Sequence, residues 1–405
     1  MLSYKYTARD PKTGEKTKAF VQADNIQNAA KLIRAQGLSP IDIVVQDDSS
    51  TGLLKYVNRV RTKDRILFTR QLATLINAGL PLIQSLRSVM SQTTSKPLKV
   101  ICGRIIADIE EGSTLSAAVG RFPNVFNEIF ISLVAAGEVS GTLDKSLERV
   151  ADQQEKDADI ISKVRGAMIY PAVVLGVMLL VMGFMITTVL PQVGLLYDGI
   201  NGAQLPFVTV MLLAVSDFVI KFWWLLLIIV IAGVVLGSRW IQTLGGRRFL
   251  DKAKMRLWPF GPLFMKMYMA RFARTGATLV ASGVPLLQIM EITARSVNNV
   301  HIADSLKRAS QQVKGGKALS DSLSNDPNFL ELVPNMIRIG EQSGSLEAML
   351  DKVASYYEKE VDNQIKTIST IIEPVMMIVL GIVAMIIVAA VLLPIYSLAN
   401  KGFGS

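Results

Sequence analysis

The sequence predicts a mainly α-helical membrane protein with two homologous cytoplasmic helical bundles, three transmembrane helices and a small N-terminal α/β domain. Three observations lead to this fold class. Half of the 405 residues are hydrophobic and only 19% are charged, a composition too apolar for an ordinary soluble chain. Three long apolar runs are almost free of charge, and one block of helical sequence occurs twice, 204 residues apart.

The N-terminal segment, residues 1–46, is predicted to form the small α/β domain. Residues 4–8 and 18–23 alternate like strands, residues 25–37 have the pattern of a helix ending at Gly37, and a last strand follows. The polar segment after this domain, residues 47–63, is predicted to be a linker.

Residues 64–167 have the periodicity of a helical bundle. Gly79 is expected to stop the first helix, and Pro81 is suited to the first turn of the next one. Further helices are expected at residues 96–111, 115–120 and 127–138. A long helix is then expected to run from about Leu143 into the membrane.

The second half of the chain repeats this bundle in residues 239–373. The sequence ATLINAGLPLIQ at residues 73–84 returns as ATLVASGVPLLQ at residues 277–288. Towards the end of each copy the offset falls from 204 to 203 residues. Matched pairs include Phe68 and Phe272, Arg70 and Arg274, Gly79 and Gly283, Gly112 and Gly316, Glu138 and Glu341, and Gly141 and Gly344.

Three transmembrane helices are predicted at residues 168–190, 219–238 and 374–393, because about 20 apolar residues span the hydrocarbon layer. The first and third follow equivalent bundles. Two copies entering the membrane in the same direction require one return crossing, which the unmatched middle helix supplies. Residues 191–218 and 394–405 are then an extracytoplasmic connection and a short extracytoplasmic tail.

The charge distribution predicts the orientation. Residues 1–167 carry 23 Lys and Arg against 18 Asp and Glu, and residues 238–373 carry 18 against 13, whereas the connection and tail are almost uncharged. The positive-inside bias makes the bundles cytoplasmic, with the N-terminus inside and the C-terminus outside. The start of the chain has no signal-peptide pattern. The net charge of +10 is explained better by membrane lipid than by nucleic acid.

Enzymatic constellations are scarce in this sequence. It has one histidine, His301, one cysteine, Cys102, and no P-loop, so no metal, cofactor or catalytic residue is predicted. Asp217 is the one carboxylate near the middle span, and a local pair with Lys221 is favoured over an ion pathway. The chain is therefore expected not to be an enzyme.

The turns AAGEVSGTLDKSL and IGEQSGSLEAML leave two interpretations open. Glu138 and Glu341 each stand between a helix end and a sharp turn, where a carboxylate either accepts backbone hydrogen bonds or meets an arginine of a partner. The structural interpretation is favoured over docking. In the middle span, Gly233 and Gly237 form a G-x-x-x-G pair suited to helix packing, within the chain or in a dimer.

Several motifs together resemble one family, the inner-membrane platform proteins of type IV pilus assembly and type II secretion (the PilC/GspF family). They are FTRQLATLINAGLPL, AGEVSGTL, VRGAMIYP, FGPL, RFART with SGVPLLQ, IGEQSGSL, and IIEP with LLPIY. The resemblance covers nearly the whole chain, and FTRQLAT and VRGAMIYP favour the pilus branch.

The resemblance implies a non-enzymatic role in coupling a cytoplasmic hexameric ATPase to insertion or extraction of pilin or pseudopilin subunits, alongside other inner-membrane assembly proteins. By similarity, docking or bundle-geometry candidates are Arg70, Glu138, Gly141, Arg274, Glu341 and Gly344. A small-solute transporter is the alternative from another class, and an intramembrane protease is disfavoured because a second carboxylate is missing. Whether the protein works as a homodimer is left open.

Overall fold

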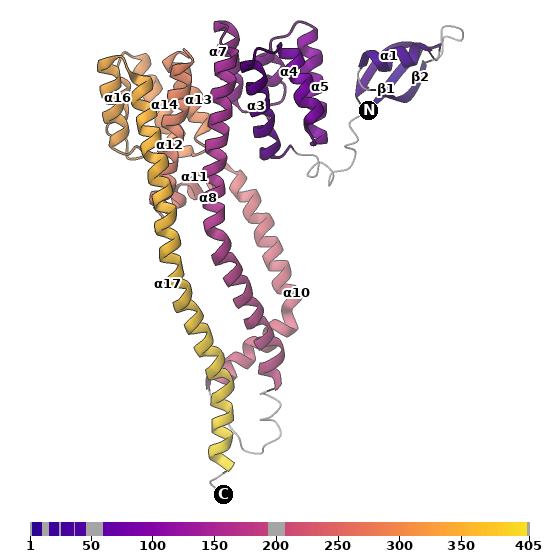
Figure 1. Ribbon diagram of the computed structural model, residues 1–405. Helices are drawn as coiled ribbons and strands as arrows, with labels where there is room; N and C mark the ends of the chain where they lie inside the picture. Colours follow the sequence, from indigo (N-terminus) through magenta and orange to yellow (C-terminus); the bar gives the residue numbers. More distant parts are fainter. Residues whose placement is uncertain are drawn as a thin grey trace. The chain divides into compact units, whose positions relative to one another are not determined.

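The structure is a computed structural model, and it describes residues 2–9, 16–23, 26–35, 37–45, 60–192 and 207–402 (Figure 1). The chain forms two compact units, Met1–Asp152 and Gln153–Ser405. Most of the predicted linker, the middle of the predicted extracytoplasmic connection and the last three residues lie outside the described residues.

The N-terminal domain is a three-stranded antiparallel sheet with one helix. Its strands β1 (Leu2–Arg9), β2 (Lys16–Ala23) and β3 (Ser39–Val45) are ordered β2-β1-β3. The helix α1 (Ile26–Ala35) lies between β2 and β3 in the chain. Strands and helix thus occur in the predicted order.

The core of this domain is small. Ile33 of α1 packs with Tyr6 and Ala8 of the central strand β1, and all three are buried. Gly37 adopts a φ of 78°, a left-handed conformation that glycine takes without steric penalty, and it ends the helical segment as predicted.

The first bundle, residues 60–152, consists of helices joined by short turns. Its elements are α3 (Thr62–Asn77), α4 (Leu82–Gln92), α5 (Lys96–Glu110), α6 (Leu115–Gly120), α7 (Glu128–Ser140) and the start of α8 (Leu143–Phe184). Gly79 has a φ of 85° after α3, as expected for a helix stop, and Pro81 is the residue directly before the first turn of α4. Cys102 lies in the core, where burial raises the pKa of its thiol to about 12 and makes it unreactive.

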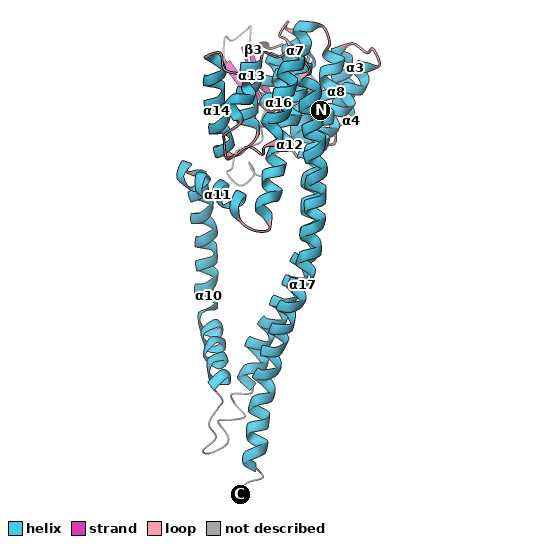
Figure 2. Cartoon of the chain, turned by 90° about the vertical axis from the view of Figure 1, so that its left-hand side faces the viewer, coloured by secondary structure: helices cyan, strands magenta, loops and turns pink. Residues whose placement is uncertain are grey.

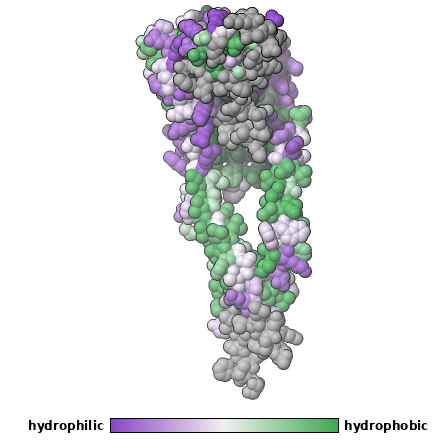
Figure 3. All heavy atoms as spheres, turned by 90° about the vertical axis from the view of Figure 1, so that its right-hand side faces the viewer, coloured by the Kyte–Doolittle hydropathy of each residue, from purple (hydrophilic) through white to green (hydrophobic). Residues whose placement is uncertain are grey.

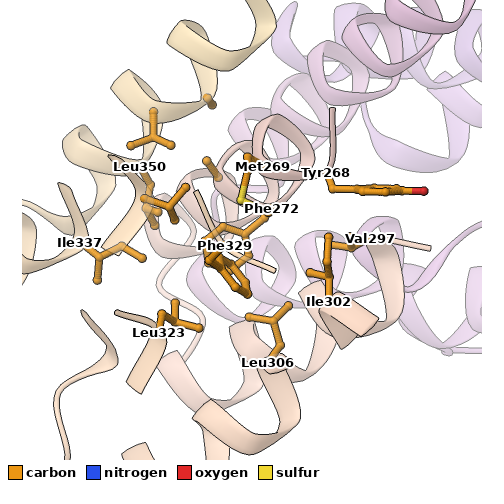
Figure 4. Packing of buried hydrophobic residues seen from close by; sticks show 14 of the residues in the cluster. Tyr268, Met269, Phe272, Val297, Ile302, Leu306, Leu323, Phe329, Ile337 and Leu350 are labelled. Atoms are coloured by element: carbon orange, nitrogen blue, oxygen red, sulfur yellow. The ribbon is translucent and has the colours of Figure 1, made fainter. Parts of the chain in front are cut away.

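The second bundle repeats the first and adds one helix before it. Its elements are α11 (Leu244–Arg256), α12 (Phe260–Ala281), α13 (Leu286–Ser296), α14 (Val300–Lys314), α15 (Leu319–Leu323), α16 (Leu332–Ser343) and the start of α17 (Leu346–Gly402). Side chains from α12 to α17 meet in one core around Phe272 and Phe329 (Figure 4).

Equivalent aromatic pairs show how closely the two bundles correspond. Phe68 and Phe126 have ring centroids 6.0 Å apart in the first bundle, and Phe272 and Phe329 have centroids 5.2 Å apart in the second. Their numbering is offset by 204 for the first ring and 203 for the second. The single-residue difference therefore falls in the loop before α7 and α16.

Three long helices carry the apolar segments. They are α8, which continues through the π-helical turn η1 (Met185–Val189) to Gln192, α10 (Phe207–Gln242) and α17. Each is long and apolar enough to cross a membrane. Figure 2 shows α10 and α17 extending from the second bundle, and Figure 3 shows hydrophobic residues gathered along the long helices.

The helices extend further than the predicted spans. The middle helix begins at Phe207, inside the predicted connection, and has a non-helical residue, Phe222, with φ −115°. Pro171 lies inside α8, and α17 continues through Pro374 and Pro394 to Gly402, so the prolines that bracket the predicted spans do not end these helices. Membrane helices tolerate proline where the freed carbonyls find other donors.

Candidate functional site

The repeated turn between α7 and α8, and between α16 and α17, has the same geometry in both bundles. Gly141 and Gly344, at φ 70° and 68°, cap the preceding helices in the left-handed conformation. A Cβ on Gly137 would lie 2.6 Å from the Ser146 hydroxyl oxygen, and one on Gly340 would lie 2.9 Å from the Leu346 Cα atom. Both pairs of glycines are thus required by close helix packing and by a sharp reversal.

Glu138 caps the short helix α6. Its carboxylate accepts hydrogen bonds from the backbone N–H of Leu115 and, at 3.0 Å, from that of Ser116. The next N–H, from Ala117, donates to the hydroxyl of Thr114 at 3.2 Å. The first three N–H groups of α6, which have no intrahelical acceptor, are therefore all satisfied by side chains.

Glu341 caps α15 in the second bundle. Its carboxylate accepts from the N–H groups of Leu319 at 2.7 Å and Ser320 at 3.2 Å, and also from the Ser320 hydroxyl at 2.6 Å. The N-cap residue itself, Ala318, has no side-chain oxygen. The glutamate therefore provides more of the capping in this copy than Glu138 does in the first.

Both glutamates therefore cap helices, which is the structural role that was favoured from the sequence. A carboxylate held at a helix N-terminus is stabilised by the helix dipole and by charge-assisted hydrogen bonds. Two residues beside them, Val139 and Gln342, are exposed, with Val139 at 92%. If a partner contacts this turn, the exposed neighbours are better placed to meet it than the capping carboxylates.

Arg274 is nearly buried between α12 and α17. Its guanidinium donates to both carboxylate oxygens of Glu358, at 2.7 and 2.9 Å, to Asp351 and to the Ser355 hydroxyl at 3.2 Å. Burial alone would lower the pKa of Arg274, but its hydrogen bonds and charge interactions with Glu358 and Asp351 raise it. The arginine thus ties α12 to α17 as a permanent cation.

Arg70, the equivalent residue, is more exposed. It donates to Asp152 near the start of α8, with 31% of its side chain and 56% of the aspartate side chain exposed. The residue equivalent to Asp152 in the second copy is Ser355. Both arginines therefore bond to this same position on the long helix of their own bundle, which holds an aspartate in the first copy and a serine in the second.

Besides the contacts of Arg274, a polar cluster that was not predicted from the sequence lies where α8, α12 and α17 meet. We call this region the neck, comprising residues 157–167 of α8, 260–271 of α12 and 360–372 of α17. Lys163 of α8 donates to both carboxylate oxygens of Asp362 of α17, at 3.0 and 2.9 Å. Lys266 of α12 donates to Glu360 of α17 at 2.8 Å.

The neck also has an apolar core. Leu263, Val361, Ile365 and Ile368 are buried there, and the apolar side chains of α8 pack against them, including Ile160. The signal in the sequence was the apolar spacing of Ile160, Val164 and Ala167 between charged residues of α8. This spacing could have shown that α8 keeps a packed face before it reaches the membrane.

Gly233 and Gly237 make no close helix contact within the described part of this chain, which leaves packing in a dimer as a prediction. A Cβ on Gly233 or Gly237 would meet nothing within 4 Å, so the G-x-x-x-G face is open. The predicted pair of Lys221 with Asp217 is replaced by a contact of the Lys221 ammonium with the Phe222 ring, at 5.9 Å from its centroid. Among the described residues there is also no cluster of three potential metal ligands.

The fold and these joints define a class of protein: a membrane protein built from a duplicated bundle-and-span unit with a small N-terminal domain. The family model for type II secretion system protein F matches twice, at residues 68–191 and 272–394, and the model for the N-terminal domain of that protein matches residues 1–44. The chain belongs to this family, which includes PilC and GspF proteins.

Curated relatives come from both branches of the family. The chain is 35% identical to a type IV pilus assembly protein PilC of Thermus thermophilus, over 98% of each chain. It is 34% identical to PilC of Pseudomonas aeruginosa, over 91% of this chain and 98% of the relative. It is also 34% identical to type II secretion system protein F of P. aeruginosa, over 98% and 99%. These identities do not separate the pilus branch from the secretion branch.

Proposed function

We propose that the protein is the inner-membrane platform of a type IV pilus or type II secretion machine, and that it couples a cytoplasmic hexameric ATPase to movement of pilin or pseudopilin subunits. The continuous helices α8 and α17 carry this proposal. Each begins at a glycine-capped turn of a bundle and runs without a break into an apolar segment. A displacement of a bundle would therefore reach the membrane through a rigid rod.

The length of α17 fits a transmitting role. With a rise of about 1.5 Å per residue, its 57 residues extend about 85 Å. The ion pairs and apolar contacts of the neck join α17 to α8 and α12, so these helices would move together. The protein itself is proposed to be non-enzymatic and to take its energy from the ATPase.

The test is to break α17 between the second bundle and the membrane. Lys366 is exposed in the neck, between the buried Ile365 and Ile368. Lys366→Pro removes one helix hydrogen bond and costs about 3 kcal/mol locally, whereas Lys366→Ala keeps the helix. We expect the proline variant to reach the membrane but to lose filament assembly or secretion, and the alanine variant to retain it. Full activity of the proline variant would disprove the rod mechanism.

Partner contact is tested with a photo-crosslinking amino acid at the exposed Val139 and Gln342. Capture of the ATPase from either position supports the proposal. Capture of neither the ATPase nor pilin components from any cytoplasmic position would contradict it. The transporter alternative predicts instead that Asp217→Asn leaves assembly intact but abolishes movement of a solute.

The orientation is also a proposal: N-terminus and bundles in the cytoplasm, C-terminus outside the inner membrane. It rests on the positive charge of both bundle segments. A cysteine introduced at Ser405 should react with a membrane-impermeant reagent added from outside. Reaction only after the membrane is opened would overturn the three-span orientation.

A further inference from the structure

The helix α11 leaves the middle membrane helix through a tightly built joint. Thr243 lies between α10 and α11, donates its hydroxyl to the Trp240 carbonyl at 2.6 Å and accepts from the Gly246 N–H at 3.2 Å. A Cβ on Gly246 would lie 2.0 Å from the Trp240 carbonyl oxygen. The joint therefore requires glycine, and α11 turns away from the axis of α10 within one helical turn (Figure 2).

The position of the joint in the chain places α11 near the membrane surface. After Lys221 the apolar part of α10 has no charge until Arg239. Leu244, the first residue of α11, lies about 8 Å further along at 1.5 Å per residue. The headgroup layer on each side of the hydrocarbon core is about 5–8 Å thick. A chain that turns at this point enters a layer of headgroups.

One face of α11 is fixed to the second bundle. Asp251 is 3% exposed, and its carboxylate accepts from the Val300 N–H at the start of α14, at 3.0 Å. Arg247 donates to the Asn298 side chain at 2.8 Å, next to the N-cap residue of α14. These bonds set the rotation of α11 about its own axis and leave its other face turned outward.

Large apolar and aromatic side chains are exposed at both ends of α11 and, at Phe249, on its outward face. Phe249 packs against Trp240 with ring centroids 5.6 Å apart, and both remain at least half exposed. The large exposed apolar residues here are Trp240 (50%), Leu244 (78%), Phe249 (63%), Leu257 (61%) and Trp258 (74%). A patch of this kind marks an interaction site, and exposed tryptophans beside a span are typical of the membrane interface.

Cations lie among these apolar residues. Lys252 and Arg256 follow Phe249 at spacings of three and seven residues, which puts all three on one face of the helix. Both are exposed, and neither has an ion pair among the residues that the structure describes. The one carboxylate of α11, Asp251, is buried on the other face, so the outward face has an uncompensated positive charge.

We propose that α11, with its flanking Trp240 and Trp258, is an interfacial helix that inserts its aromatic residues into the leaflet on the bundle side and binds anionic phospholipid headgroups through Lys252 and Arg256. The combination of an apolar aromatic surface, basic residues and continuity with a membrane helix matches the chemistry of an anionic bilayer surface. This role goes beyond filament assembly or secretion and does not depend on either. The first bundle has no equivalent helix among the described residues.

The test uses the full chain in vesicles, with Trp258 as the single tryptophan. Trp223→Phe, Trp224→Phe and Trp240→Phe remove the others. Quenching of Trp258 by phosphatidylcholine brominated near the headgroup end of its chains reports insertion. Comparing brominated phosphatidylglycerol with brominated phosphatidylcholine, at equal mole fraction, gives the preference for anionic lipid. Lys252→Gln with Arg256→Gln is the charge variant. Lys314→Gln with Lys317→Gln, on exposed lysines at the far end of α14, is matched in charge loss.

We expect strong quenching by both lipids, with a preference for phosphatidylglycerol. This preference should fall by about fivefold for each cation removed in the charge variant and stay unchanged in the matched control. Trp258 that is quenched by aqueous iodide but not by brominated lipid would overturn the proposal, and would instead indicate a protein-docking surface. Equal quenching by the two lipids would overturn the headgroup assignment. The insertion measurement needs no charge variant, so it stands even if that variant misfolds.

Discussion

The two helical bundles share their backbone joints and differ in how one equivalent arginine is held. Both have left-handed glycines at the same turns, a glutamate capping the short helix and a pair of phenylalanine rings in the core. Arg274, however, is nearly buried and bonded to Glu358, Asp351 and Ser355, whereas the side chain of Arg70 is 31% exposed and bonded to Asp152.

The two bundles also differ in the charges on their surfaces. Arg87 pairs with Glu110 in the first bundle, while the equivalent positions in the second hold Glu291 and Lys314, with the charges exchanged. Positions whose backbone conformation or close packing admits few residues have kept the same residue. Positions where solvent screens the charge have diverged. The two bundles are therefore one scaffold with two surfaces, suited to different contacts.

The largest expected difference between the bundles follows removal of the arginine. Arg274→Ala leaves Glu358, which is 22% exposed, without its bidentate partner, and should lower the stability of the second bundle by about 2–3 kcal/mol. Arg70→Ala should lower the stability of the first bundle by about 0–1 kcal/mol, because both side chains of the ion pair with Asp152 are solvated. Hydrogen exchange of the helix amides measures each bundle separately in the full chain.

Arg274→Lys is the control for charge. Lysine keeps the positive charge but cannot form the two parallel hydrogen bonds to Glu358, so an intermediate loss is expected. Equal losses of stability in Arg274→Ala and Arg70→Ala would show that the two arginines are energetically equivalent. This result would contradict the proposed difference between the two bundles.

The close glycine contacts should behave alike in both bundles. Gly137→Ala places a methyl group against Ser146, and Gly340→Ala places one against the backbone of Leu346. Each should destabilise its bundle by about 2 kcal/mol in thermal unfolding. Gly103→Ala, inside α5 with its nearest neighbour 4.0 Å away, is the control and should be neutral or stabilising by up to about 1 kcal/mol. A neutral Gly137→Ala would mean that the helices separate easily at this turn.

The carboxylate of Asp326 is expected to make the stability of the second bundle depend on acid. Burial alone would raise the pKa of Asp326, but hydrogen bonds from Ser305, the Asn328 N–H and Arg308 lower it. The lowered pKa means that the stabilisation is complete above the ordinary value of 3.8 and disappears as the pH falls through the folded-state pKa. The equivalent residue in the first bundle is Phe122.

The variant Asp326→Asn isolates this term. Relative to wild type it should destabilise the second bundle by about 1–2 kcal/mol at neutral pH, and the difference should shrink below pH 3.8. Denaturant unfolding at several pH values, followed by hydrogen exchange, gives the difference. A constant difference across this range would show that the aspartate contributes through packing rather than charge.

The smallest expected effect is an exchange of helix caps. Thr114 caps α6, while Ala318 stands at the same place before α15 with a similar extended backbone, φ −61° and ψ 145°. Ala318→Thr should stabilise the second bundle by about 0.5–1 kcal/mol, and Thr114→Ala should destabilise the first by a similar amount. Thermal unfolding of the pair of variants checks this. Ala318→Ser serves as a second capping variant, and no gain from either would show that Glu341 already satisfies the helix start.

Much of the fold could be predicted because it depends on local and periodic signals. The glycine stops at Gly79 and Gly141, the helices between them and the duplication at offsets of 204 and 203 are all visible in the residues themselves, and the matching of one family model twice confirms the repeat. The ends of the membrane helices were harder to predict from the sequence. Proline usually marks a boundary in soluble helices, and Pro374 and Pro394 do not do so here.

The candidate site was likewise predictable only in part from the sequence. The sequence identified Glu138 and Glu341 as candidates but did not decide between helix capping and partner docking. The backbone N–H groups that bond to these carboxylates lie more than twenty residues away in the chain. It could not distinguish Arg70 from Arg274, which occupy the same motif position. It included the basic residues around α11 only in the total charge of residues 238–373.

The sequence by itself therefore determined the class of protein, the duplication, the number of apolar segments and the turns that need glycine, since each depends on residue type and spacing along the chain. The tertiary structure decided which carboxylates cap helices, which arginine is buried, how α8 joins α12 and α17 in the neck, and which face of α11 is turned outward. These depend on distances between residues far apart in sequence, where hydrogen bonds and burial set the energy of each charge.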